Sequence, residues 1–206
     1  MKNNSTLTDW LFSPFKFIAG GKALVLGLIF MMLLASLASL SGIYFDGAID
    51  IHTGSPDSPF ALHAYFQLCN WLVMTTVFYI AARIVTKSSI RLIDIAGTIA
   101  LSQAPLIIAV LWGFAPIAHI ELSNIDPYAI NLGELIDMLK ENILEIALTS
   151  IVLLIPAIWT IILKYNAYSI SANLKGNKGV ASFVIALLIS ELITKILHYF
   201  LAPLFV

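Results

Sequence analysis

The sequence predicts an all-α, polytopic membrane protein: a bundle of five transmembrane helices with a cytoplasmic N-terminus and an external C-terminus. Hydrophobic residues make up 60% of the 206 residues and charged residues only 11%, which leaves too few polar side chains to cover a soluble globule. A helix needs about 20 apolar residues to cross a bilayer. Five stretches come close to that length or exceed it, at residues 23–45, 61–82, 95–118, 143–163 and 180–202.

The orientation follows from where the basic residues lie. Nine of the eleven Lys and Arg residues precede the first span or border the second and fourth connections: Lys2, Lys16, Lys22, Arg83, Lys87, Arg91, Lys164, Lys175 and Lys178. The first and third connections are acidic instead. Because basic loops stay in the cytoplasm, the N-terminus is predicted to be cytoplasmic and the C-terminus external. The net charge of −1 gives no indication of a nucleic-acid partner.

Residues 1–22 are predicted to form a cytoplasmic or interfacial segment ahead of one domain, residues 23–206. The segment carries aromatic residues beside Lys16, as expected of a chain that lies among lipid headgroups. A flexible leader is the alternative, because a proline interrupts the helical pattern. Residues 35–38 also resemble the cleavage site of a signal peptide, but the apolar run continues past them to Phe45, which favours a retained span.

The connections and the prolines give further expectations. Residues 46–59 are rich in Gly, Ser and Pro and are expected to form an irregular external connection. Asn131 and Glu134 have the spacing of a capping box, so the fourth helix is expected to begin outside the membrane. Pro105 and Pro156 lie inside the third and fourth spans, where each removes a backbone hydrogen bond and is expected to kink its helix.

The sharpest polar pattern is in the last span, where Glu191, Lys195 and His198 are spaced at i, i+4 and i+7 and share one helix face. A charge at the centre of a membrane helix costs about 2.5–3.5 kcal/mol on insertion scales. A direct Glu191–Lys195 pair would offset part of that cost, and the face is expected to point into the bundle. It is a candidate lining of a polar cavity together with three residues of the second and third spans, Gln67, Asn70 and Gln103. The alternative is a satisfied hydrogen-bond network between helices.

No sequence motif indicates catalysis or a cofactor. The chain lacks a zinc-protease helix, a serine nucleophile elbow and a phosphate-binding glycine loop, so it is not expected to be an enzyme. An external divalent-metal site can be imagined from three histidines and the loop acids, namely His52, His63, His119, Asp46, Asp50, Asp57 and Glu121. Nothing in their spacing brings these residues together, and no metal site is expected.

Two segments carry a resemblance to a known family. The stretch Ile158-Trp159-Thr160-Ile161-Ile162-Leu163-Lys164-Tyr165-Asn166-Ala167-Tyr168, followed by residues 176–181 and another span, resembles the C-terminal half of the Yip family of membrane proteins. The third span, with Arg91, Asp94, Gly97 and Pro105, is similar to the Gly-to-Pro helix of that family. Together these segments cover about half of the chain.

The resemblance implies a five-helix bundle and, in eukaryotic members, a role in vesicle trafficking through Rab GTPases. Those proteins carry a substantial cytosolic N-terminal region that is implicated in partner binding, whereas only about twenty residues precede the first span here. Rab binding is therefore not carried over. The chain is more similar to the short prokaryotic relatives, which implies a location in a bacterial cytoplasmic membrane.

The function expected from these observations is that of a non-enzymatic scaffold or membrane-organising protein. It would act through the lipid bilayer and through a membrane-protein partner or a second copy of the chain, with a cytoplasmic interface formed by Arg83, Lys87, Arg91 and Asp94. The alternative is a small solute or ion transporter, or a channel subunit, that uses the polar face of the last span. Water-filled continuity between that face and either surface would favour transport, whereas a closed, dry pairing would favour the scaffold.

Overall fold

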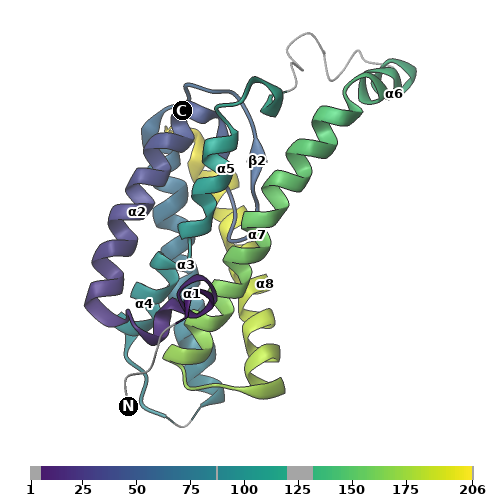
Figure 1. The fold of residues 1–206 in the computed structure, drawn as a ribbon. Helices are drawn as coiled ribbons and strands as arrows, with labels where there is room; N and C mark the ends of the chain where they lie inside the picture. The colour runs from purple at the N-terminus through teal and green to yellow at the C-terminus, as the bar shows by residue number, and fades with distance from the viewer. Residues whose placement is uncertain (1–5, 87, 120–131, 206) are drawn as a thin grey trace.

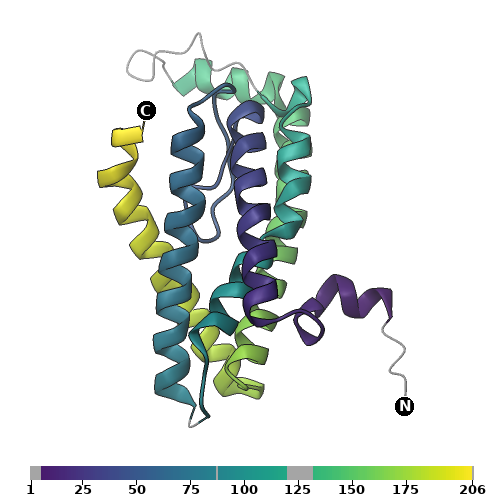
Figure 2. The ribbon, with the colours of Figure 1, turned by 90° about the vertical axis from the view of Figure 1, so that its left-hand side faces the viewer.

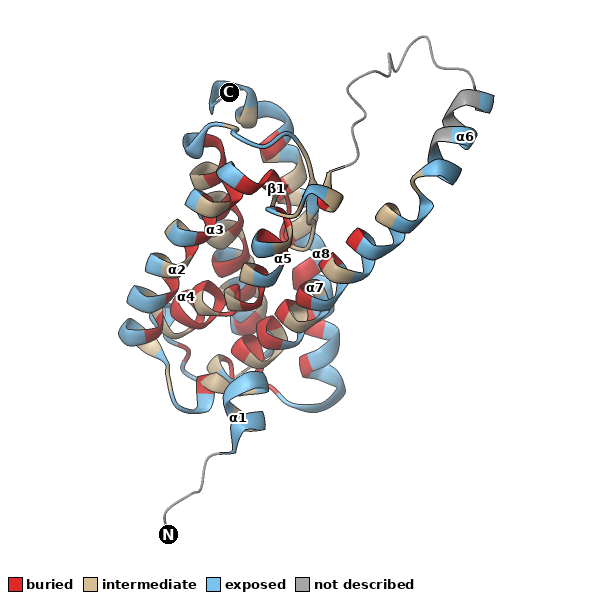
Figure 3. Cartoon of the chain, turned by 45° about the horizontal axis from the view of Figure 1, so that its top comes forward, coloured by how far each residue is buried: buried red, intermediate tan, exposed pale blue. Residues whose placement is uncertain are grey.

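The computed structural model describes residues 6–86, 88–119 and 132–205, and this part of the chain is almost entirely helical (Figure 1). Five of its segments are long and apolar enough to cross a membrane, which confirms the five predicted long apolar helices: α2 (Gly20–Ser41), α3 (Phe60–Val85), α4 to α5 (Leu92–Trp112), α7 (Ile143–Ser171) and α8 with η4 (Gly176–Phe205). Figure 3 shows buried residues inside the bundle and exposed residues, many of them apolar, around it. The arrangement is compatible with a multi-pass membrane protein.

The five segments run alternately along the bundle, so α2 begins at one end and α8 finishes at the other (Figures 1 and 2). Described basic residues gather at the end where α2 begins, next to the termini of the helices that meet there: Lys16, Lys22, Arg83, Arg91, Lys175 and Lys178. The grouping of Lys164 with them was wrong, because this side chain is only 4% exposed and lies inside the bundle. Lys2 and Lys87 lie outside the described residues.

Two glycines let α2 pack closely on α4 (Leu92–Leu101). A Cβ atom on Gly27 would lie 2.5 Å from the Cβ of Ala100, and a Cβ on Gly97 would lie 2.5 Å from the carbonyl oxygen of Gly20. Small residues permit such close approach between membrane helices, where packing drives association. Gly20 itself has φ +60° and is the first residue of α2.

The third span is broken next to Pro105, as predicted. α4 and α5 (Ile107–Trp112) are separated by a short 3₁₀ helix, η2 (Ala104–Leu106), because proline cannot donate a backbone hydrogen bond to the preceding turn. Gln103 lies at this break, with its side chain 3% exposed. Pro156 lies inside α7, which continues through it as one helix.

The connection between α2 and α3 departs most from the sequence prediction. It is not an irregular external loop, because β1 (Ile43–Tyr44) and β2 (His52–Thr53) form an antiparallel hairpin that pairs Ile43 with Thr53 and Tyr44 with His52. Gly42, with φ 65°, ends α2 in the left-handed conformation that reverses the chain. The loop of the hairpin, residues 45–51, turns back into the bundle (Figure 2). We call residues 43–53 the re-entrant hairpin.

The N-terminal segment is helical and docks on α7. In α1 (Leu7–Phe12) a capping box joins Thr6 and Asp9, and η1 (Pro14–Lys16) follows it. The indole nitrogen of Trp159 donates a hydrogen bond of 2.9 Å to the carbonyl oxygen of Leu11, and the amide of Asn166 donates one of 2.5 Å to that of Phe12. Residues 7–12 and 14–16 are thus helical, and the segment is bonded to α7.

Two further short helices, η3 (Pro116–Ala118) and α6 (Leu132–Glu141), lie before α7. The Nζ atom of Lys140 lies 3.0 Å from the Asp137 carboxylate, and both side chains are exposed. The predicted capping box cannot be assessed, because Asn131 and the Glu134 side chain lie outside the described residues.

Replacing Gly27 by Ala is expected to lower the free energy of unfolding by about 1–3 kcal/mol, because overpacking forces the helices apart. The added methyl group would also lie 2.7 Å from the backbone nitrogen of Leu101. Gly21→Ala is the matched control on the same helix, since its Cβ would meet Ile93 at an ordinary 3.8 Å. Thermal unfolding in one detergent compares the two variants. Equal midpoints would contradict the close α2–α4 contact.

Candidate functional site

The loop of the re-entrant hairpin lies at about half the height of the bundle. The side-chain amide of Asn70 donates a hydrogen bond of 2.7 Å to the carbonyl oxygen of Phe45. Asn70 is ten residues into α3, which corresponds to a depth of about 15 Å at 1.5 Å per residue. Irregular backbone at such a depth in a membrane is tolerated only where protein or a polar cavity surrounds it.

Two charged side chains hold the tip of the loop. The Lys164 ammonium of α7 donates a hydrogen bond to the carbonyl oxygen of Ala48, and the Glu191 carboxylate of α8 accepts one of 2.9 Å from the backbone N–H of Ile49. The tip needs a glycine at position 47, because a Cβ there would lie 2.5 Å from the Glu191 carboxylate and 2.9 Å from the Cβ of Asp50. The loop backbone and the helix charges therefore fit each other sterically and electrostatically.

Lys195 pairs with the loop and not with its own helix. Its ammonium lies 3.0 Å from the Asp46 carboxylate and also contacts that of Asp50, and these three side chains are between one quarter and two fifths exposed. The predicted pair of Lys195 with Glu191 is wrong, since no such ion pair occurs among the described residues. Lys195 is thus paired with two carboxylates, and Glu191 accepts a hydrogen bond from the backbone N–H of Ile49. A pair along the helix would have given each charge only one partner.

His52 completes a cluster with Asp46, Asp50 and Lys195, which we call the acidic cluster. Its Nδ1 atom lies 3.4 Å from the Asp46 carboxylate and 3.9 Å from that of Asp50. Burial acts to raise the pKa of Asp46, but hydrogen bonds from His52 and Lys195 outweigh burial and hold that pKa well below its usual range. The hydrogen bond to Asp46 in turn raises the pKa of His52 above its ordinary value. His52 therefore accepts a proton more readily than a free histidine.

Ligand atoms of Asp46, Asp50 and His52 lie within 4.8 Å of one another, close enough to hold a metal ion. In the structure the ammonium group of Lys195 is the cation that pairs with the Asp46 and Asp50 carboxylates. His63 and His119, the other members of the imagined external metal site, bind Ser58 and the carbonyl oxygen of Gly113 elsewhere. Glu121 of that set lies outside the described residues.

Most of the polar residues predicted to face a cavity do meet around the loop. The Nε2 atom of His198 lies 2.9 Å from the amide oxygen of Asn70, so these two residues form a chain of hydrogen bonds that ends at Phe45. Gln103 reaches the loop from the α4–η2 break. Gln67 is buried, but neither of its side-chain polar atoms has a hydrogen-bond partner in the described part of the chain.

The predicted cytoplasmic interface lies at the basic end of the bundle, away from the acidic cluster. Arg91 precedes α4, and its Nε atom lies 3.8 Å from the Asp94 carboxylate in an exposed ion pair. Arg83 is exposed in the last turn of α3. Lys87 lies outside the described residues.

The acidic cluster is open toward the end of the bundle where α7 begins. A groove of about 480 Å³ runs along α7 past Asp50 and His52 and is also lined by Thr149 and Ser150. On the other side of the loop the space is filled, because Phe78 packs against Tyr168 and Phe183 with ring centroids 5.4 and 5.6 Å apart. The groove therefore reaches the loop along α7, whereas aromatic rings pack between α3, α7 and α8.

Lys195→Met is expected to lower the free energy of unfolding by about 1–3 kcal/mol, because it leaves two half-buried carboxylates without their cation; fully buried pairs lose about 3–5 kcal/mol. Lys140→Met is the matched control, since its pair with Asp137 is 70% and 73% exposed and contributes little. Chemical unfolding in detergent measures both variants. Equal losses for the two substitutions would show that Lys195 is not paired in the folded protein.

Comparison with protein-family models, with curated proteins and with solved structures finds no match to this chain. The resemblance of residues 158–168 and 176–181 to the Yip family stays an expectation from the sequence. Function must therefore be argued from the chemistry of the site, because a helical bundle by itself hosts many functions.

Proposed function

We propose that the protein is a proton-linked transporter of a small solute, with the re-entrant hairpin as its binding element. The observation that carries this proposal is the concentration of ionisable groups around irregular backbone at half the height of the bundle. Charged side chains at such a depth are costly, and they mark solute or ion pathways more often than structural contacts. Transporters also build binding sites from interrupted helices near the middle of the membrane, and the break at η2 lies beside this loop.

The charge balance of the site supports a role for protons. Three carboxylates, those of Asp46, Asp50 and Glu191, face the ammonium groups of Lys164 and Lys195, so one negative charge is left until His52 takes a proton. His52 lines the open groove and has a raised pKa. A change in its protonation therefore alters the net charge of the site.

The open groove supports transport over static packing. Alternating access requires a site that opens to one surface while the other side is closed. The groove reaches Asp50 and His52, whereas aromatic rings around Tyr168 pack toward the opposite end of the bundle. In the proposed orientation the basic end is cytoplasmic, so the groove faces outward.

The second candidate function is a Yip-like scaffold, and one observation favours it. Six described basic residues surround one end of the bundle, and each would contribute about 1 kcal/mol of attraction to an anionic membrane surface. Arg91 and Asp94 would then act in an interface at that end with lipid, a membrane protein or a second copy. This function would require nothing of the acidic cluster.

Proteoliposomes that contain a trapped pH indicator test the transport proposal. A small-molecule extract of the source cells, added outside, is expected to drive proton movement in vesicles with the wild-type protein and not in empty vesicles. Asp50→Asn is expected to abolish the response because it changes the charge of the site. Asp137→Asn, in an exposed pair on α6, is the control and should respond like the wild type.

Two results would contradict the proposal. The first is no proton movement in wild-type vesicles with any fraction of the extract. The second is an equal response from Asp50→Asn and from wild type. Either result, combined with a stoichiometric membrane-protein partner in native-lipid purifications, would favour the scaffold.

A further inference from the structure

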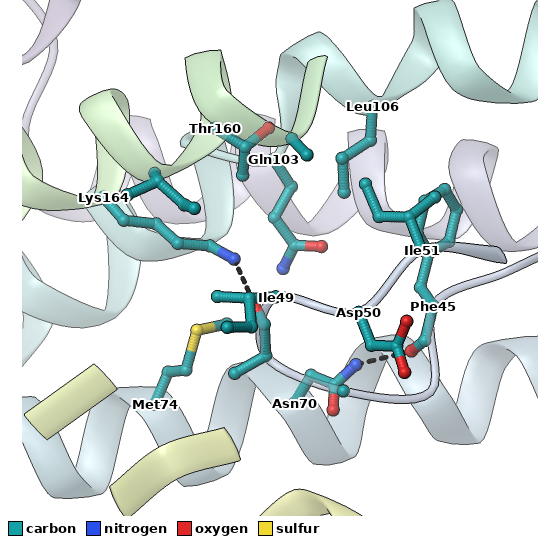
Figure 4. Close-up of a pocket in the computed structure, with 14 residues that line it drawn as sticks. Phe45, Ile49, Asp50, Ile51, Asn70, Met74, Gln103, Leu106, Thr160 and Lys164 are labelled. Atoms are coloured by element: carbon teal, nitrogen blue, oxygen red, sulfur yellow. Dashed lines mark hydrogen bonds between the residues drawn. The ribbon is translucent and has the colours of Figure 1, made fainter. Parts of the chain in front are cut away.

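A second polar space lies on the face of the loop turned away from α8. It is a small cavity of about 20 Å³ lined by residues of the loop, the α4–η2 break, α3 and α7 (Figure 4). A water molecule needs about 10–15 Å³ measured in this way, so the cavity has room for one water or one monatomic ion. It is too small for a phosphate or a carboxylate.

Three buried side chains present hydrogen-bond donors to this cavity. The Nε2 atom of Gln103 and the hydroxyl of Thr160 have no partner within the described residues, and these side chains are 3% and 2% exposed. Lys164 is 4% exposed and donates one hydrogen bond within the described residues, to Ala48, which leaves further N–H groups of its ammonium available, although the charge of Glu191 also attracts that ammonium. Figure 4 shows the Lys164 ammonium and the Gln103 amide on the same side of the loop.

The negative charges of the site are directed away from these donors. Asp50 contributes to the cavity wall, but its carboxylate binds Lys195 and points away from Lys164 (Figure 4). The Glu191 carboxylate is bound to the backbone N–H of Ile49 and does not line the cavity. Asn70 also lines the cavity, but its amide is already bonded to Phe45 and His198. The remaining donors, one ammonium group, one amide N–H₂ and one hydroxyl, form a set that suits an anion.

We propose that this cavity binds a single halide-sized anion, with chloride as the physiological candidate. The ammonium of Lys164 supplies the charge, and Gln103 and Thr160 direct N–H and O–H groups at the ion. Leaving a buried donor unpaired costs about 1–3 kcal/mol, and an anion would give a partner to both Gln103 and Thr160, the two donors that lack one within the described residues. The inference does not rest on the transport proposal, because anion binding is an equilibrium property that requires no flux.

The test is a chloride titration of the purified protein in detergent, in gluconate buffer at constant ionic strength, followed by thermal unfolding. A ligand that binds only the folded state raises the unfolding temperature in a saturable manner. The wild-type protein is expected to show this rise with chloride and with bromide. Gln103→Glu, which replaces donors by a carboxylate of the same shape, is expected to weaken the apparent affinity by at least about tenfold, the value of one good hydrogen bond.

A second variant pair keeps the test independent of folding defects. Thr160→Val removes the hydroxyl with little change in volume and is expected to weaken chloride binding by about tenfold. Thr76→Val, on the exposed side of α3, is the matched control and should bind like the wild type. Absence of a halide response in the wild type would show that the cavity holds only water and would overturn the proposal. An undiminished response in both cavity variants would place the ion elsewhere and would also overturn it.

Discussion

The fold depends on side-chain hydrogen bonds to an irregular stretch of backbone, the loop of the re-entrant hairpin, inside a helical bundle. In the bilayer core an unpaired peptide group costs several kcal/mol, so a loop can enter only where side chains replace water. Three helices supply these partners: α3 through Asn70, α7 through Lys164 and α8 through Glu191. Because α7 and α8 diverge from their connection, the loop also fills the space between them (Figures 1 and 2). The charged side chains that would be a liability in an ordinary membrane helix here complete the fold.

The same loop separates two chemical environments. On the side of α8, carboxylates from the loop meet Lys195 and His52 next to an open groove. On the side of α4 and α7, Lys164, Gln103 and Thr160 line a small cavity, and Asp50 contributes to its wall. The loop, residues 45–51, thus lies between the carboxylates that bind Lys195 and the donors around Lys164. Gly47 allows the Glu191 carboxylate to approach the loop backbone closely. This separation is the physical basis for proposing one site that takes up protons and another that takes up an anion.

The membrane spans were predictable because the bilayer imposes length and apolarity on each helix locally. The break at Pro105 was predictable for the same reason, since the missing N–H is a property of one residue. The re-entrant hairpin was not predictable, because its partners are distant in sequence: Ala48 and Lys164 are 116 residues apart, and Asp46 and Lys195 are 149 apart. Local spacing instead suggested a pair between Glu191 and Lys195. One signal was present, however, because the loop alternates Asp and Gly with the apolar residues Phe45, Ala48, Ile49 and Ile51, an unusual composition for a connection in water.

The central claim is that residues 45–51 lie inside the bundle, and thiol labelling tests it most directly. The single native cysteine is replaced first, as Cys69→Ser. Ala48→Cys at the loop tip, where the native side chain is 3% exposed, is then compared with Ser55→Cys at the exposed outer end of the connection. In lipid nanodiscs a membrane-impermeant maleimide should label position 55 quickly and position 48 only after unfolding. Equal labelling rates at both positions in the folded protein would contradict the account.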